Sequence, residues 1–291
     1  MSYPDEVNSG INPEEILQNN RIANLEYSIQ PISFAFLKSL ESIISLLNPY
    51  KAKCDLNRIG NYSDGGYVVA AEATDSKKLC INLGVGNEVS ADIHLLNLGY
   101  NVIAVDGTVE NPLLLEKQYL FVKSNIGYSR RSGEKSLSKI LRQNKWGKDV
   151  DLILIDIEGF EYQLLQREWN HISRARQIVI EFHGLELLGD EGFSERLIHA
   201  LKIINKTHRV IHVHGNNAGP AIPVGGASWP TILEVTFLRK SEVLDVRNYG
   251  PFPGRLDASN TNVRPDIALE PFFGPKENYG KVARNILHFT K

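Results

Sequence analysis

Short apolar segments alternate with amphipathic ones through the middle of this chain, and no other feature limits its fold as much. Five strand-length segments, at 79–84, 101–106, 119–127, 150–159 and 176–184, follow one another at intervals of about 20 to 30 residues. Strands without polar alternation are buried on both faces, as in parallel sheets that helices cover from both sides. The pattern therefore predicts an α/β fold of the Rossmann-like, doubly wound kind.

The last two predicted strands, 208–215 and 231–240, are joined by a loop rich in Gly, Pro and Asn instead of a helix. A connection without a helix favours an antiparallel hairpin, because parallel neighbours need a long crossover. Together with the five segments above, these strands predict a mostly parallel seven-stranded sheet that ends in an antiparallel hairpin.

The chain outside this alternation forms two flanking regions. Apolar positions recur at helical spacing from 32 to 47, after a polar, Asn-rich stretch over 1–30 that is predicted to include a loosely ordered arm. Residues 1–50 are therefore predicted to form an N-terminal helical appendage, and 51–240 the Rossmann-like domain. The tail, 241–291, contains aromatic residues, prolines and arginines with little periodicity, which predicts a substrate loop or lid.

Charge and cysteine content restrict the compartment and the partners. The net charge of −2 argues against broad binding to nucleic acid or to anionic membranes. The two cysteines, Cys54 and Cys80, lack metal-binding spacing, and the first residues lack the basic and apolar regions of a secretory signal. We expect a cytoplasmic protein without membrane or nucleic-acid partners; its oligomeric state, with a homodimer as one option, stays open.

The first predicted strand ends in a glycine-containing turn, NLGVGNE, at 82–88. Glycines at a strand-to-helix turn let the backbone approach a ligand closely. The next strand ends in Asp106, twenty residues beyond Gly86, where a carboxylate can accept hydrogen bonds from both hydroxyls of a ribose. Gly84, Gly86 and Asp106 therefore predict a nucleoside pocket at the strand ends.

The helix after this turn distinguishes between nucleoside cofactors. Dinucleotide sites favour a third glycine in G-x-G-x-x-G, but Val89 occupies that position here. Glu88 would also repel a pyrophosphate at the helix N-terminus. Because S-adenosylmethionine carries no phosphate, the turn favours a methyltransferase over an NAD-dependent oxidoreductase.

The fourth strand carries a more specific pattern. Together with the next helix it reads VDLILIDIEGFEYQLL at 150–165, which resembles the D-I-E-G-x-E-x-x-x-L signature of the FkbM family of methyltransferases. The segments 58–69, 178–184 and 212–217 also resemble parts of this family, so the likeness spans roughly residues 55–240. The resemblance implies a class I, Rossmann-like methyltransferase that uses S-adenosylmethionine. The signature is matched at Asp156, Ile157, Glu158, Gly159, Glu161 and Leu165.

The same resemblance implies where the cofactor lies. It places the methionine part along the two glycines of the first turn and the ribose hydroxyls on Asp106. It further implies that Asn125 and Ile126 border the adenine, and that Asp156 lies near the amino group and the reacting methyl. The cofactor-binding residues expected on this basis are Gly84, Gly86, Glu88, Asp106, Asn125, Ile126 and Asp156.

Polar side chains gather at the ends of the later strands, where open α/β sheets place their ligands. A divalent cation (magnesium, manganese or zinc) held by Asp156, Glu181 and His183 would lower the pKa of a hydroxyl acceptor. Alternatively, His183 beside Asp156 would act as a general base without a metal. A third alternative is that the histidines only satisfy hydrogen bonds of the core. The cluster comprises Asp156, Glu158, Glu181, His183, His212, His214, Asn216 and Asn217.

Methyl transfer from a sulfonium is a displacement to which the protein mainly contributes alignment. A sugar hydroxyl is a poor nucleophile while protonated, so a base or metal beside it favours O-methylation of a sugar or another polar hydroxyl acceptor, either a small molecule or a glycan. His183 and Asp156 are the expected catalytic residues. By resemblance, Arg58, Asp64 and Tyr67 would close over the cofactor or the acceptor. Apart from the resemblance, aromatic residues and arginines of the tail are expected to line the acceptor site, namely Tyr249, Phe252, Arg255, Arg264, Phe272 and Phe273. An NAD-dependent oxidoreductase, a metal-dependent hydrolase and a non-catalytic scaffold stay as rivals.

Overall fold

The computed structural model places all described residues in one compact unit. The predicted loose arm over 1–30 lies outside the described residues. Within the described part of the chain, no helix is long and apolar enough to cross a membrane. The structure describes residues 34–71, 78–113, 116–129, 134–143, 150–275, 278 and 280–282.

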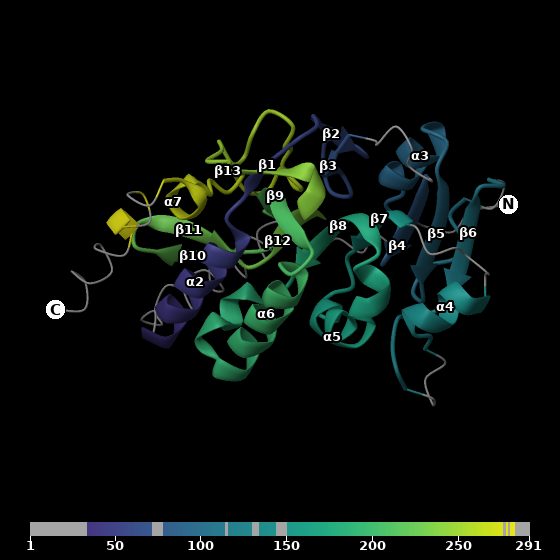
Figure 1. The fold of residues 1–291 in the computed structure, drawn as a ribbon, viewed down its shortest axis with the longest axis horizontal. Helices are drawn as coiled ribbons and strands as arrows, with labels where there is room; N and C mark the ends of the chain where they lie inside the picture. Colours follow the sequence, from purple (N-terminus) through teal and green to yellow (C-terminus); the bar gives the residue numbers. More distant parts are fainter. Residues whose placement is uncertain are drawn as a thin grey trace, which may run out of the picture. The chain divides into compact units, whose positions relative to one another are not determined.

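Seven strands form the central sheet, in the spatial order β6 (Tyr119–Lys123), β5 (Asn101–Asp106), β4 (Leu79–Leu83), β7 (Val150–Ile155), β8 (Ala175–Phe182), β12 (Leu233–Arg239) and β9 (His208–Gly215). The first five are mutually parallel, whereas β12 runs antiparallel to both β8 and β9 (Figure 1). The predicted mostly parallel, seven-stranded sheet with a terminal antiparallel hairpin is therefore confirmed.

The strand order creates one point at which the direction of winding reverses. From β4 the chain adds β5 and β6 on one side, and then returns to add β7 and β8 on the other. Every residue of β4, β7 and β8 is buried, as expected of mostly apolar strands at the centre of a parallel sheet. At such a switch point, the carboxyl ends of the strands frame a crevice in which α/β proteins bind ligands.

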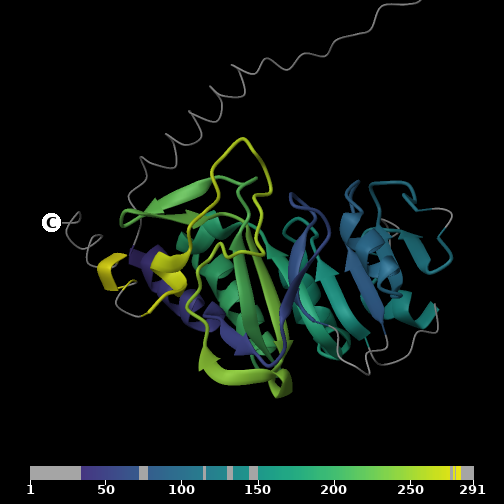
Figure 2. The same cartoon turned by 90° about the horizontal axis from the view of Figure 1, so that it is seen from above.

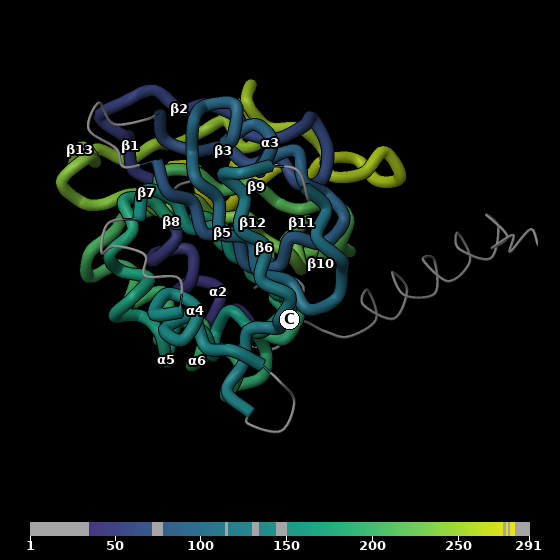
Figure 3. The backbone as a smooth tube through the Cα atoms, turned by 90° about the vertical axis from the view of Figure 1, so that its right-hand side faces the viewer, coloured from purple at the N-terminus to yellow at the C-terminus, as the bar shows by residue number. Residues whose placement is uncertain are grey.

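One face of the sheet is covered by helices, three of which correspond to amphipathic segments that predict helices over 136–144, 160–169 and 192–206. Amphipathic patterns form them; α5, for example, buries Leu164, Leu165 and Ile172. Figures 1 and 3 show these helices on the same side of the sheet, with α2 beside α6. The helices on this face are α2 (Phe34–Leu47), α4 (Leu137–Gln143), α5 (Glu161–Ile172) and α6 (Glu191–Ile204).

The opposite face carries α3 (Ser90–Asn97) and two small antiparallel pairs of strands (Figure 3). The hairpin of β2 (Leu56–Ile59) and β3 (Tyr67–Ala70) contains the turn predicted near residue 65. It is bonded to the sheet through polar groups: the Thr236 hydroxyl donates to the Val68 carbonyl at 2.6 Å, and the Gln177 side chain pairs with the Ala70 backbone.

The tail contains more regular structure than its sequence suggests. Residues 243–247 form β13, which pairs with β1 (Tyr50–Ala52), and a short helix, α7, covers Glu270–Phe273. Between them, residues 248–269, here called the tail segment, run past β9 and β12 (yellow and green in Figure 2). Periodicity in the tail sequence does not reveal β13, because three of its five residues are exposed.

Two connections also differ from expectation. The Gly/Pro/Asn-rich loop before β12 contains its own small hairpin, β10 (Ala221–Val224) paired with β11 (Ala227–Pro230). The sequence also predicts a short helix over 113–118; residues 114 and 115 lie outside the described residues, and 113, 117 and 118 are in turns. Both segments are short, and short segments are decided by packing more than by local preference.

Candidate functional site

A cavity of about 570 Å³ lies at the carboxyl ends of β4, β5 and β7, at the switch point of the sheet. We call it the main cavity. The structure brings together in its lining every residue that the sequence predicts for the cofactor. Those residues are Gly84, Gly86, Glu88, Asp106, Asn125, Ile126 and Asp156.

The two glycines of the first turn have different physical roles. Gly84 has a φ of +86°, and a Cβ added to it would lie 1.6 Å from the backbone oxygen of Asp156. This position therefore brings the turns after β4 and β7 into contact. Gly86 also has a positive φ, +57°, but no described atom lies within 4 Å of its added Cβ. Gly86 thus leaves the cavity open, and its amide donates to Asp106 Oδ2 at 2.8 Å.

Asp106 is held as a buried, ionised carboxylate. Oδ1 accepts from the amide and the hydroxyl of Thr108, both at 2.6 Å, and from the Val109 amide at 3.3 Å. Burial by itself would raise the pKa of Asp106, but these bonds and the one from Gly86 lower it below its usual value. Because Oδ1 already has three donors, Oδ2 retains more capacity to accept a hydrogen bond from a ligand.

Asn125 and Ile126 follow β6, the strand next to β5, and this adjacency brings them beside Asp106. The Ser124 amide donates to the Asp106 carbonyl at 3.0 Å. A Cβ on Gly107 would lie 2.1 Å from Asn125 Oδ1, so only glycine lets the two turns approach this closely. Sequence reasoning missed Thr108 and Ser124, which also line the cavity, because single hydroxyl residues after a strand carry no distinctive pattern.

His183 lies just beyond β8 and faces a group of carboxylates. Its Nε2 is 3.4 Å from Glu158 Oε2, and 3.7 Å from both Asp156 Oδ1 and Glu181 Oε1. The predicted catalytic pair and the predicted metal set are therefore close together in space. Asp156 and Glu158 line the main cavity, at what we call its acceptor end.

Glu161 is fully buried and contacts His183 on the Nδ1 side of the ring. Its Oε2 accepts from the Gly159 amide and its Oε1 from the His183 amide, both at 2.8 Å. Oε1 also lies 3.4 Å from His183 Nδ1. Glu161 was noted only as part of the D-I-E-G-x-E signature; the structure shows that it joins the turn after β7 to the end of β8.

The acceptor end holds more acidic groups than it can keep ionised. Burial raises the pKa of Asp156 to about 7; His183 opposes this shift and Glu158 adds to it. Burial, with the charge of Asp156, also raises the pKa of Glu181 well above its usual value. Burial lowers the pKa of His183, but Glu161 and the neighbouring carboxylates outweigh it and raise the pKa overall.

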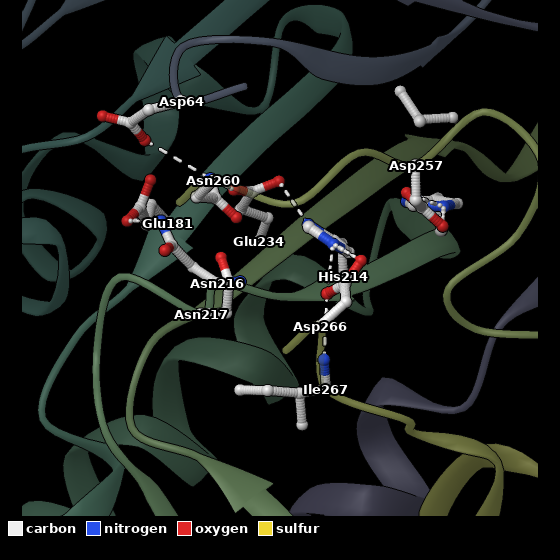
Figure 4. A network of polar contacts seen from close by, with 12 residues as sticks. Asp64, Glu181, His214, Asn216, Asn217, Glu234, Asp257, Asn260, Asp266 and Ile267 are labelled. Carbon is white, nitrogen blue, oxygen red and sulfur yellow. Dashed lines mark hydrogen bonds and ion pairs between the residues drawn. The ribbon is translucent and has the colours of Figure 1, made fainter. Parts of the chain in front are cut away.

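A row of polar side chains crosses three strands on the face beneath the tail segment (Figure 4). Glu181 in β8 is opposite Glu234 in β12, which is opposite His214 in β9. Glu234 Oε2 lies 3.2 Å from His214 Nδ1, and His214 Nε2 lies 3.2 Å from Asp266 Oδ1. Asn260 donates to Glu234 Oε1 at 2.7 Å, so two tail residues bind this row.

The predicted polar cluster therefore separates into two groups. Asp156, Glu158, Glu181 and His183 lie together, and Asn216 donates to Glu181 Oε1 at 2.8 Å. The remaining members anchor the tail segment. His212 Nε2 is 3.1 Å from Asp257 Oδ1, His214 pairs with Asp266, and Asn217 donates to the backbone oxygens of Thr261 and Arg264.

The Methyltransferase FkbM domain matches residues 53–204, which is just over half of the chain and includes both the glycine turn and the D-I-E-G-x-E segment. The chain belongs to this family. It is an S-adenosylmethionine-dependent methyltransferase, as the resemblance implies. A search of curated proteins finds no match.

Solved structures similar to this FkbM-domain methyltransferase are distant. Fibrillarin, in its complex with Nop5p, shares 13% identity with a TM-score of 0.37, over 56% of this chain and 72% of that one. A candidate RNA methyltransferase of Pyrococcus horikoshii shares 14%, with a TM-score of 0.33, over 56% and 75%. A candidate methyltransferase of Streptococcus mutans, in complex with S-adenosylhomocysteine, shares 10%, with a TM-score of 0.31, over 72% and 97%. The assignment rests on the family match.

Three more residues were expected to close over the cofactor or acceptor of this FkbM-domain methyltransferase. Asp64 and Tyr67 line the main cavity, as expected. Arg58 instead binds backbone oxygens, of Asn61 at 2.7 Å and of Leu256 at 3.2 Å, and so joins the hairpin to the tail segment. Of the tail aromatics, Phe272 and Phe273 pack against Trp229, and no described residue of the tail lines the main cavity.

Proposed function

We propose that this methyltransferase methylates a hydroxyl oxygen of a sugar or another polar acceptor, with His183 as the general base. The observation that carries the proposal is the position of His183 Nε2, 3.7 Å from Oδ1 of Asp156, a residue that lines the main cavity. A histidine in this position can take the proton of a hydroxyl group as the oxygen becomes methylated. The net charge of −2 supports a small-molecule or glycan acceptor over a nucleic acid.

The residues of the main cavity suit S-adenosylmethionine. Gly86 leaves open space where a side chain would otherwise lie, and Asp106 Oδ2 can accept a ribose hydroxyl. Asp64, Glu88 and Asp156 line the same cavity, and their carboxylates suit a ligand with a positive sulfonium. When bound, the cofactor supplies an electrophilic methyl group.

In the reaction, His183 would take up one proton and Glu161 would hold the histidine ring in its orientation. His183 Nε2 would take the proton of the acceptor hydroxyl, and the surrounding carboxylates would stabilise the imidazolium that results. Glu161, on the Nδ1 side, keeps the ring oriented. The role of the protein is thus alignment together with proton transfer.

A divalent cation is a second proposal for the acceptor end. Asp156, Glu158 and His183 each offer one ligand atom, and these atoms lie within 4.8 Å of one another. Glu158 thus takes the place that sequence reasoning assigned to Glu181, which stays 3.7 Å from His183 Nε2. Magnesium, manganese or zinc bound there would lower the pKa of the acceptor hydroxyl.

The cofactor proposal is tested by Asp106→Ala. We expect affinity for S-adenosylmethionine to fall by about 2–3 kcal/mol, roughly 30- to 150-fold, because charge-assisted hydrogen bonds are lost. Isothermal titration calorimetry measures this change, with the exposed Asp245→Ala as the control. Unchanged affinity would contradict the assignment, and stabilisation of the wild type by NAD instead of S-adenosylmethionine would favour an oxidoreductase.

The variant His183→Ala and chelation with EDTA together distinguish a metal-independent general base from a bound divalent cation. If His183 is a metal-independent base, activity survives EDTA and falls about 10²- to 10⁴-fold in His183→Ala, while cofactor binding stays intact. In that case wild-type activity rises with pH through a midpoint above 6.5, because the pKa of His183 is raised. Loss of activity in EDTA, with recovery on adding one divalent metal, would instead support the cation. His171→Ala in α5 is the matched control.

A further inference from the structure

The candidate base faces a second hollow outside the main cavity. This hollow, of about 590 Å³, lies along α5 and the start of α6, and its lining includes His183, Gly184 and Phe193. Glu158 and Phe160 line both this hollow and the main cavity. Among the described residues, the turn after β7 therefore lies between the space beside His183 and the predicted methyl end of the cofactor.

The turn between the two spaces has an unusual backbone. Glu158 has a φ of +51°, a conformation rare for residues other than glycine, and Gly159 follows with a φ of +94°. No described atom lies within 4 Å of a Cβ added to Gly159, so the turn leaves open space there. Glu161 holds this conformation through the Gly159 amide. Backbone outliers of this kind concentrate at functional sites.

The hollow continues along the helices. A further hollow of about 470 Å³ reaches His199 in α6, and the two share Tyr162, Gln166 and Arg196. We call the combined space the α5–α6 groove. Each part has the size of a small-molecule site, so the whole is larger than a single sugar ring needs.

The chemistry of the groove suits a chain of hydroxyl groups. Gln163 and Gln166 offer amide donors and acceptors, and Arg196 offers an exposed guanidinium. Tyr162 donates its hydroxyl to the His183 carbonyl at 2.5 Å, and its ring, which packs against Phe182 and Phe193, lines the groove. Phe160 adds a second aromatic ring near the turn.

We propose that the α5–α6 groove binds the acceptor and that the acceptor is an oligosaccharide, held over at least two sugar units, with its terminal hydroxyl at His183. This inference rests on the proposed function. A hydroxyl group that must meet both the methyl group and His183 has to lie at the turn shared by the two spaces. The groove is the described hollow that reaches this turn from the side of His183.

The test compares trisaccharides of glucose, galactose, N-acetylglucosamine and rhamnose with the matching monosaccharides, with tritiated methyl groups on S-adenosylmethionine. The wild type is expected to favour at least one trisaccharide over its monosaccharide by tenfold or more in kcat/KM. Gln166→Ala and Arg196→Ala should raise KM for that trisaccharide at least fivefold with little change in kcat. Lys202→Ala, on an exposed part of α6 outside the groove, is the matched control.

Calorimetry with S-adenosylmethionine keeps the two proposals apart, because Gln166 and Arg196 line the groove and should leave cofactor affinity unchanged. If the wild type and both variants label monosaccharides equally, the proposal that the groove binds the acceptor is wrong, but the proposal of sugar methylation stands. If cofactor binds and no carbohydrate is labelled, both the groove and the sugar acceptor are overturned. Labelling of a peptide substrate in a parallel assay would have the same consequence.

Discussion

Asp106 is held by its own turn and by Gly86, twenty residues away, whereas Glu234 and His214 are held by Asn260 and Asp266 from the distant tail segment. The cofactor half of the site is thus assembled from consecutive strand–turn–helix units. The half around β8, β12 and β9 also needs the tail segment, whose residues bind polar side chains of β12 and β9. Polar groups of the first half are organised locally, and those of the second depend on closure of the chain.

This contrast has an electrostatic side. Asp106 is stabilised as an anion by backbone amides, which cannot titrate in the accessible range. His214 is instead stabilised as a cation by two carboxylates: burial lowers its pKa, but Asp266 and Glu234 raise the pKa to about 10. The contribution of Asp106 to stability is therefore constant near neutral pH, whereas the contribution of His214 changes with pH.

The largest effect is expected from His214→Ala. Removal of the imidazolium leaves the Glu234 carboxylate buried without its partner, and breaking a buried pair costs about 3–5 kcal/mol in the free energy of unfolding. Urea denaturation measures the loss. His199→Ala, at an exposed position on α6, should change stability by less than about 0.5 kcal/mol. Equal small losses in both variants would show that the tail contact contributes little.

Gly84→Ala probes the local half with a somewhat smaller effect. A left-handed backbone costs about 1–2 kcal/mol for a residue with a Cβ, and the overlap with the Asp156 backbone adds a further cost, for a total of about 3 kcal/mol. Gly86→Ala has only the conformational cost, because open space surrounds its added Cβ. If the two variants unfold at the same urea concentration, the close approach of the two turns is not a constraint.

The pH dependence of stability sharpens the comparison. Since the folded pKa of His214 is about 10 and its unfolded value is about 6.5, its contribution is complete below pH 6.5 and is lost as pH rises toward 10. Between pH 7 and pH 9 the loss should be about 2 kcal/mol, measured as the difference between the wild type and His214→Gln. A constant difference over this range would mean that His214 is neutral in the folded protein.

Asp257 sets the acid limit of a second contact of the tail segment, the one with His212. Burial raises its pKa, but His212 and the Gly254 amide lower it below the usual value of about 3.8. Its contribution is therefore present above that value and is lost as pH falls through the lower, folded pKa. The tail segment should resist limited proteolysis best from about pH 4 to 6.5.

The sequence alone determined the seven strands and most of the helices, because burial imposes a period on apolar residues that needs no knowledge of the partner. The residues that it predicts for the cofactor line one cavity, since the carboxyl ends of parallel strands meet at one edge and the turns there are local. The D-I-E-G-x-E segment carried the family for the same reason. These features depend on neighbours in sequence.

The tertiary structure alone decided which polar groups meet. Nothing in the spacing pairs β13 with β1, Asn260 with Glu234, or Asp266 with His214, because these contacts join residues far apart in the chain. The same holds for the bond between Glu161 at the start of α5 and the amide of His183, which follows β8. A residue type shows that a side chain needs a partner, but only the path of the chain shows which partner it has.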